Sequence, residues 1–185
     1  MCNYDQFLKL NLEVKIIEVF RNPVDLVYSW SKKNLATRFG RDKRIFTLLI
    51  EKNKKPYSQH LYNLPIYWNK LNDIEKSILY VKILTDRSVK QLKKNYNKNI
   101  YLTDYETIVE NTANELKKIA KFLNTSFSKK TYKFIKRENC PKKIDYNLKN
   151  KKVEFINSKV SKKYSKLLID IEKKYIKNIY GLKKT

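Results

Sequence analysis

Two short runs of apolar, β-branched residues predict buried strands, and each is followed by a helical pattern. The first run is "VKIIEVF", residues 14–20, in which Glu18 fits a buried strand least well. Asn22 is a candidate N-cap, and Pro23 suits the first helical position, where its missing N–H is not needed. Five residues then share one helical face: Val24, Val27, Tyr28, Ser31 and Leu35. This order of strand, sharp turn and helix predicts one βα unit of an α/β protein.

The second run, "IYLTDYE" at residues 100–106, also predicts a strand, and "TANELKKIAKFLN" at 112–124 predicts the helix after it. Thr112 and Glu115 have the spacing of a capping box, and Asn124 is suited to end the helix. Four residues form an expected core-facing stripe: Leu116, Ile119, Ala120 and Leu123.

The rest of the chain predicts mainly helices and connections. Residues 38–70 lack a sustained period and predict a long connection with short helices. Asp73 is expected to cap a long helix with Ile74, Ile78, Val81, Val89 and Leu92 at near-helical spacing. After a lysine-rich loop at 136–152, a last helix is predicted from Val160, Tyr164, Leu167, Leu168, Ile171 and Tyr175, with Gly181 beyond its end. The pattern predicts one α/β domain over residues 1–185, with parallel strands flanked by helices and a helix-rich C-terminal half.

Composition supports a folded chain and narrows its chemistry. The 185 residues are 42% hydrophobic and 13% aromatic, which is enough material for a core. No apolar run reaches the length of a membrane span, and the first residues lack a signal-peptide layout, so a cytoplasmic protein is expected. Cys2, Cys140 and the single histidine, His60, do not make a disulfide framework or a metal-ligand pattern, so no metal site is predicted.

The net charge of +24 admits a polyanionic partner such as nucleic acid. However, the lysines are dispersed through every segment, which is typical of a solvated surface. The chain has only 2 glycines and 4 prolines, and lysine, asparagine, isoleucine and tyrosine are abundant, a bias expected of AT-rich coding sequence. A basic nucleic-acid-binding module is therefore kept only as an alternative.

Arg21 and Ser29 are the first candidates for a binding site. Arg21 follows the carboxyl end of a predicted strand, where open α/β sheets bind ligands. Its guanidinium offers a fork of donors to a phosphate, and the helix N-terminus beside it favours anions. Ser29, eight residues on, could donate a second hydrogen bond to the same group. On spacing alone, an Arg21 paired with an acidic side chain and a Ser29 that is simply a small helical residue explain the pattern equally well.

The stretch "KIIEVFRNPVDLVYSW" resembles the signature of the sulfotransferase family, whose donor is 3′-phosphoadenosine 5′-phosphosulfate. In that family an arginine and a serine eight residues later hold the donor's 3′-phosphate, and Arg21 and Ser29 match them. Downstream, "IYLTDYETIVENTANELKKIAKFLN" resembles the family's strand, Tyr/Phe-Glu and helix. The resemblance spans residues 14–124 most firmly. It implies a P-loop-like fold and transfer of a sulfuryl group to a hydroxyl or amine acceptor by direct displacement at sulfur.

The same resemblance suggests further site residues. Tyr105 matches a tyrosine that lies near the adenine in cytosolic family members, although a half-buried aromatic on a strand is an equal reading. A late basic loop closes over the 3′-phosphate in the family, and Arg137, Lys142 and Lys143 are the candidates here. The arginine-lysine-glycine pattern of cytosolic members is absent, so a solvated loop is the alternative.

The chain also departs from an intact member of the family. It has no glycine-rich phosphate loop, because neither Gly40 nor Gly181 lies in such a setting, and the segment that carries the family's usual catalytic base is missing. We therefore expect the C-terminal portion of a sulfotransferase, with an inactive nucleotide-binding remnant as the alternative. The catalytic base, acceptor and oligomeric state are not predicted. His60 could serve as a base but matches no catalytic position, so a surface or packing histidine is expected.

Overall fold

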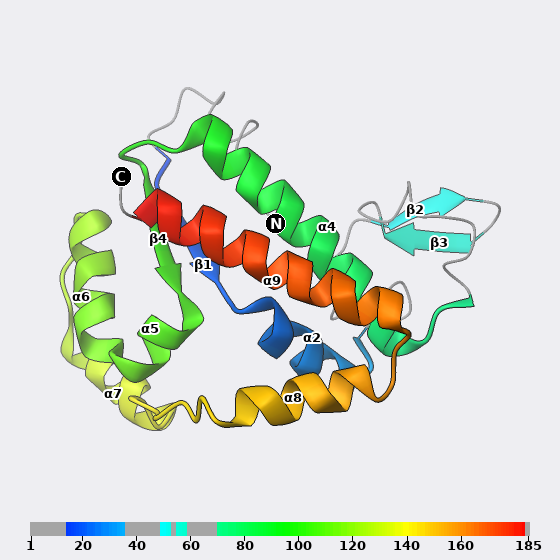
Figure 1. Cartoon of the computed structure of the whole chain (residues 1–185). Helices are drawn as coiled ribbons and strands as arrows, with labels where there is room; N and C mark the ends of the chain where they lie inside the picture. The colour runs from blue at the N-terminus through cyan, green and yellow to red at the C-terminus, as the bar shows by residue number, and fades with distance from the viewer. Residues whose placement is uncertain (1–13, 36–48, 53–54, 59–69, 184–185) are drawn as a thin grey trace. The chain divides into compact units, whose positions relative to one another are not determined.

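The computed structural model describes residues 14–35, 49–52, 55–58 and 70–183 (Figure 1). In chain order the elements are β1 (Ile16–Phe20), α2 (Pro23–Lys32), β2 (Leu49–Lys52), β3 (Lys55–Ser58), α4 (Asp73–Asn95), β4 (Ile100–Asp104), α5 (Tyr105–Glu110), α6 (Thr112–Phe122), α7 (Lys129–Arg137), α8 (Leu148–Asn157) and α9 (Lys162–Lys183). β1 and β4 pair in parallel, and all the elements after β4 are helices. The predicted α/β class with a helix-rich C-terminal half is confirmed.

The described residues divide into two compact units. One comprises 22–90 and 148–183, and the other comprises 14–21 and 91–147, so that α4 begins in the first and ends in the second. Two compact units can be two parts of one domain or two separate domains. The expectation of a single domain over 1–185 therefore stays a prediction.

The second unit is built on the β1–β4 pair. Its register runs from Ile16 opposite Ile100 to Phe20 opposite Asp104. α6 ends against this pair: the ring of Phe122 lies 5.4 Å from that of Tyr101, and Lys15 donates to the Phe122 carbonyl at 2.8 Å. Two strands that are far apart in sequence are thus held side by side by their ladder and by a helix that follows the second strand.

The capping box predicted for Thr112 and Glu115 is wrong. The N-cap of α6 is Asn111, and Thr112 is the first helical residue, with its hydroxyl donating to the Val109 carbonyl. Glu115 is 3% exposed, and its Oε1 accepts hydrogen bonds from the hydroxyls of Thr103 at 2.6 Å and Tyr101 at 3.0 Å. A buried carboxylate needs such partners, so Glu115 joins α6 to β4 and is not available to cap the helix. Along the expected stripe, Leu123 is exposed and the other three residues are partly buried.

The first turn of α2 forms as its sequence predicts. The Asn22 side chain accepts from the Val24 N–H at 2.8 Å, and Pro23 is the first helical residue. Val24, Val27 and Ser31 are buried, whereas Leu35 lies beyond the end of the helix. The predicted N-cap is confirmed, and the inward face is confirmed for Val24, Val27 and Ser31, whereas Tyr28 is only partly buried.

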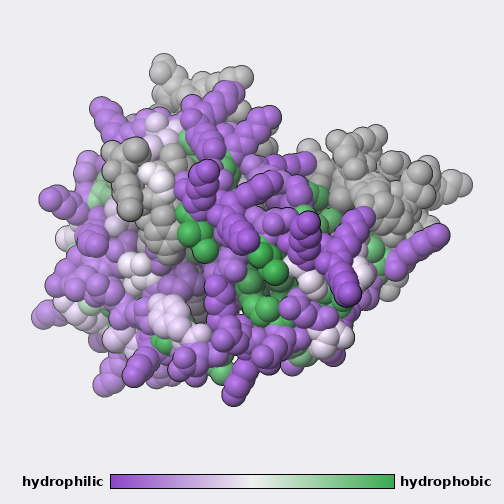
Figure 2. Space-filling model, viewed as in Figure 1, coloured by the Kyte–Doolittle hydropathy of each residue, from purple (hydrophilic) through white to green (hydrophobic). Residues whose placement is uncertain are grey.

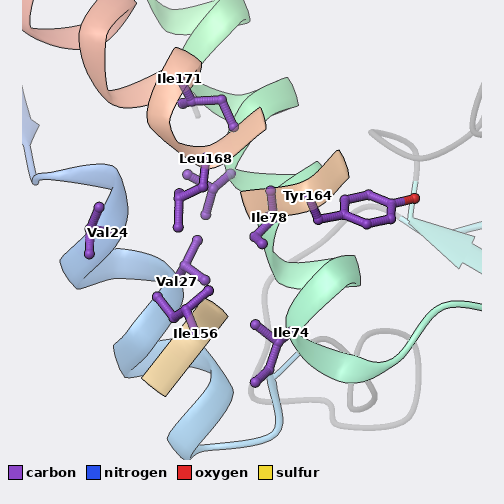
Figure 3. Packing of buried hydrophobic residues seen from close by; sticks show 9 residues of the cluster. Val24, Val27, Ile74, Ile78, Ile156, Tyr164, Leu168 and Ile171 are labelled. Atoms are coloured by element: carbon purple, nitrogen blue, oxygen red, sulfur yellow. The ribbon is translucent and has the colours of Figure 1, made fainter. Parts of the chain in front are cut away.

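The first unit has an apolar core drawn from α2, α4, α8 and α9 (Figure 3). Val27, Ile78, Val81 and Ile156 have 0% of their surface exposed. In Figure 3 the side chains of Val27 from α2 and Ile156 from α8 lie below Leu168 of α9, and that of Ile78 from α4 lies beside it. The helical faces predicted from Ile74, Ile78 and Val81, and from Tyr164, Leu168 and Ile171, meet in this cluster.

Four local predictions need correction. In place of short helices, 49–58 contains the antiparallel pair β2–β3, in which Pro56 lies opposite Glu51. Asn72, not Asp73, caps α4, since its Oδ1 accepts from the Ile74 and Glu75 N–H groups. Gly181 lies inside α9, where a Cβ would meet nothing within 4 Å. The predicted loop at 136–152 overlaps the end of α7 and the start of α8.

Candidate functional site

The parallel register brings Arg21 and Tyr105 to the same edge of the sheet. Phe20 and Asp104 are partners at the carboxyl ends of β1 and β4. Arg21 directly follows β1, and Tyr105 directly follows β4. Because parallel strands end at the same edge, these two side chains start from neighbouring positions. This edge is where ligands bind in open α/β sheets.

The guanidinium of Arg21 lies over the ring of Tyr105. Its Cζ is 4.5 Å from the ring centroid, within the range of a cation–π contact. Its Nε is buried and has no hydrogen-bond partner. No carboxylate in the described part of the chain forms an ion pair with Arg21, so the alternative of an acid-paired arginine receives no support there. The side chain keeps donors that an anion could accept from.

Tyr105 does not lie in a strand, although the sequence predicted one over residues 100–106. β4 ends at Asp104, whose side chain accepts from the Thr107 N–H at 2.6 Å and so caps α5. Tyr105 is therefore the first helical residue, and it is 39% exposed. The capping strength of aspartate decides the boundary here. It places the ring at the protein surface beside Arg21, and not in a half-buried strand position.

Ser29 belongs to the other unit. It lies in α2, two residues before the buried Ser31, and is partly buried. Within the described residues its hydroxyl has no hydrogen-bond partner. Arg21 ends the first of the two segments that make up its own unit, and the shared contact of Arg21 and Ser29 with one ligand stays a prediction.

Comparison with known proteins decides the family. A family model described as "Sulfotransferase domain" matches residues 5–183. The chain belongs to the sulfotransferase family. The family predicted from the two motifs is thus confirmed, and membership makes the protein a transferase of sulfuryl groups. Comparisons with curated proteins and with solved structures gave no match.

In this sulfotransferase the candidate basic loop is held against α5. The Lys142 N–H donates to the Val109 carbonyl at 2.9 Å, the Ile144 N–H donates to Glu110 Oε1 at 3.2 Å, and the Tyr146 hydroxyl donates to Glu110 Oε2 at 2.8 Å. Lys142, Ile144 and Tyr146 therefore each bond to a residue of α5. Lys142 and Lys143 are both exposed.

Arg137, unlike the two lysines, contacts the side chains of Glu138 and Phe134. Its Nε donates to Glu138 Oε1 at 3.1 Å, and its Cζ lies 4.6 Å from the centroid of the Phe134 ring. Both members of the ion pair are well exposed, so the pair adds little stability. The role of Arg137, Lys142 and Lys143 toward a phosphate stays a prediction.

Sequence reasoning missed Glu110, which organises this segment of the sulfotransferase. The hydrogen bond to Glu110 raises the pKa of Tyr146 to about 12, together with burial and the charges of Glu110, Glu106 and Asp104. Nothing local marks Glu110 in the sequence, because its partners lie 34 and 36 residues away. Only the order "DYETIVEN", which places a carboxylate at each end of a short helix, could have drawn attention to it.

The described residues offer neither a cluster of metal ligands nor a membrane-spanning helix. Within the described ranges, His, Cys, Asp and Glu side chains form no group of three suited to a metal ion. None of the helices there is both long and apolar enough to cross a lipid bilayer. His60 lies outside the described residues, as do Cys2 and Gly40, so its interpretation stays a prediction.

Proposed function

We propose that this sulfotransferase uses 3′-phosphoadenosine 5′-phosphosulfate as its donor, and that Arg21 binds the donor's 3′-phosphate. The observation that carries the proposal is the buried Arg21 Nε, which has no acceptor among the described residues. A buried donor left unpaired costs about 1–3 kcal/mol. A phosphate oxygen removes that cost and adds a charge-assisted bond at the edge of the sheet where ligands are expected.

Ser29 is the proposed second contact of the 3′-phosphate, on the ground of its position in the family motif. Tyr105 belongs to the same site, and Lys142 and Lys143 are the proposed basic residues that close over the phosphate. The acceptor supplies a hydroxyl or an amine. Its oxygen or nitrogen bonds to sulfur as the bond from sulfur to the 5′-phosphate oxygen breaks, the displaced proton goes to a base that is not identified, and 3′-phosphoadenosine 5′-phosphate leaves.

Calorimetry with 3′-phosphoadenosine 5′-phosphate tests the donor site. Arg21→Ala is expected to weaken binding by about 2–3 kcal/mol, as for the loss of a charged hydrogen bond, and Ser29→Ala by about 1 kcal/mol. Arg87→Ala is the matched control, because it removes the same charge from an exposed position of α4 and should leave the affinity unchanged. Equal affinities in the wild-type chain, Arg21→Ala and Ser29→Ala would refute the assignment.

The two alternatives give different results in the same set of variants. An inactive remnant binds 3′-phosphoadenosine 5′-phosphate with the same dependence on Arg21 but transfers no labelled sulfate from the donor to any acceptor offered. A nucleic-acid-binding module binds duplex DNA tightly, loses that affinity steeply as salt rises, and is indifferent to Arg21→Ala.

A further inference from the structure

The contact between Arg21 and Tyr105 has an arrangement that simple core packing does not require. Tyr105 is 39% exposed, so its ring is not needed to fill the interior. Its backbone is nevertheless fixed, because it is joined to β4 on one side and to a helix capped by Asp104 on the other. The ring is thus a surface group on a fixed support, and it lies against the one guanidinium of the proposed site.

An aromatic ring can hold an arginine without consuming its hydrogen-bond donors. Arginine loses considerable rotamer freedom when it is held in one position, and a carboxylate that held it would also occupy the N–H groups. A ring attracts the cation through its π-electrons and leaves those N–H groups for another acceptor. The unpartnered Nε of Arg21 fits this division, since the side chain is held while a donor remains unused.

We infer that Tyr105 is a positioning residue for Arg21, which makes the Tyr105 ring a determinant of selectivity for the 3′-phosphate and not a contact of the adenine. The inference rests on the proposed function of Arg21 as the phosphate-binding group. It changes the role that the family resemblance suggested for Tyr105, because the ring acts on the ligand through the guanidinium.

The two roles predict different losses with a pair of ligands. 3′-Phosphoadenosine 5′-phosphate and adenosine 5′-monophosphate share the adenine and differ at the 3′-phosphate. A ring that touches adenine contributes to the binding of both. A ring that orders Arg21 contributes only to the ligand that carries the 3′-phosphate.

The test measures both ligands by calorimetry on the full chain and five variants, one of which is Arg21→Ala and one of which combines Arg21→Ala with Tyr105→Leu. Tyr105→Leu is expected to weaken binding of the bisphosphate about three- to tenfold, the range of a cation–π contact, and to leave the monophosphate unchanged. Tyr105→Phe keeps the ring and should retain the wild-type selectivity. In the Arg21→Ala background, Tyr105→Leu should have no further effect. Tyr132→Leu is the matched control, since Tyr132 is another exposed tyrosine of the same unit, on α7.

Three results would overturn the inference while the proposed function stands. These are an equal loss for the two ligands in Tyr105→Leu, no loss for either, or a loss that persists when Arg21 is already alanine. If Arg21→Ala itself leaves the affinity for the bisphosphate unchanged, the proposed function fails first, and the inference fails with it. Because Tyr105 is exposed, its leucine variant is expected to fold, and Tyr105→Phe separates a loss of the ring from a loss of the hydroxyl.

Discussion

Two tyrosines of the same unit have raised pKa values for different physical reasons. Tyr101 is partly buried on β4, and burial is the main cause that raises its pKa to about 12, followed by its hydrogen bond to Glu115. Tyr146 is 62% exposed, and the hydrogen bond to Glu110 is the main cause that raises its pKa to about 12. The first shift comes mainly from a low-polarity environment and the second mainly from a carboxylate.

Glu110→Gln should therefore lower the pKa of Tyr146 toward 10.0 and leave that of Tyr101 unchanged. Added salt should also lower the pKa of Tyr146 more than that of Tyr101, because charges near an exposed group are screened more strongly. Phenolate absorbance in a pH titration measures both, with Tyr101→Phe and Tyr146→Phe assigning the two late components. A Tyr146 pKa that does not respond to Glu110→Gln would contradict this account.

The raised pKa of Tyr101 makes the stability of the folded chain depend on pH. Since the folded chain holds the Tyr101 proton more tightly than the unfolded chain, this contribution is fully present below pH 10 and is lost as the pH rises from 10.0 to about 12. The fall in the free energy of unfolding over that window should be less steep in Tyr101→Phe.

At the scale of helices and strands, local signals predicted the two βα units well. Asn22 and Pro23 predict the start of α2, and the β-branched runs predict β1 and β4, because caps and buried strands are encoded by neighbouring residues. Some errors have a local cause, such as the Asn72 cap of α4, and others fall where a distant partner decides. Glu115 has the spacing of a capping residue but is taken by hydroxyls of β4.

The candidate site follows the same division between local and distant information. The motif identified Arg21 from one stretch of sequence. The Tyr105 ring beneath its guanidinium depends on the pairing of two strands 84 residues apart in register, and that pairing is not encoded in either stretch alone. The hydrogen bonds of Glu110 to Ile144 and Tyr146 cannot be predicted from a local pattern either, because the partners are 34 and 36 residues away.

Two asparagines of the first unit each cap one helix and also bond to another segment. Asn22 caps α2 through its side-chain oxygen, and its Nδ2 donates to Glu172 of α9 at 2.6 Å. Asn72 caps α4 in the same way, and its Nδ2 donates to the Lys159 carbonyl at 2.8 Å. A single amide group therefore fixes a helix start and its place in the unit.

Asn72 separates these two tasks without touching the proposed site. Asn72→Ala loses both and should lower the free energy of unfolding by about 1–2 kcal/mol, whereas Asn72→Asp keeps the capping oxygen and should lose about half as much. Denaturant unfolding measures both variants. Asp73→Ala is the control for the cap that the sequence first suggested, and a larger loss there than in Asn72→Ala would show that Asn72 is not the cap.

At the scale of the whole molecule, the charge is the dominant feature. The chain has 42 Lys and Arg against 18 Asp and Glu, so even complete pairing would leave a large positive excess. Hydrophilic side chains cover most of the face shown in Figure 2. Several of the ion pairs of the described residues, such as Lys82–Asp86 and Arg137–Glu138, are exposed and contribute little. Repulsion among like charges is thus expected to outweigh surface pairing and to lower stability.

Salt should therefore stabilise this protein while it weakens donor binding. Screening at about 0.1 M salt acts over distances beyond about 10 Å, so the repulsion is reduced more than contacts within the core. We expect the melting temperature to rise by about 3 °C between low and moderate sodium chloride, equivalent to about 1 kcal/mol for a chain of this length. Over the same range, calorimetry should show weaker binding of 3′-phosphoadenosine 5′-phosphate. Arg21→Ala distinguishes screening from chloride bound at the proposed site, because screening predicts the same rise in the variant. A melting temperature that falls with added sodium chloride would mean that surface ion pairs, and not like-charge repulsion, govern the stability of the chain.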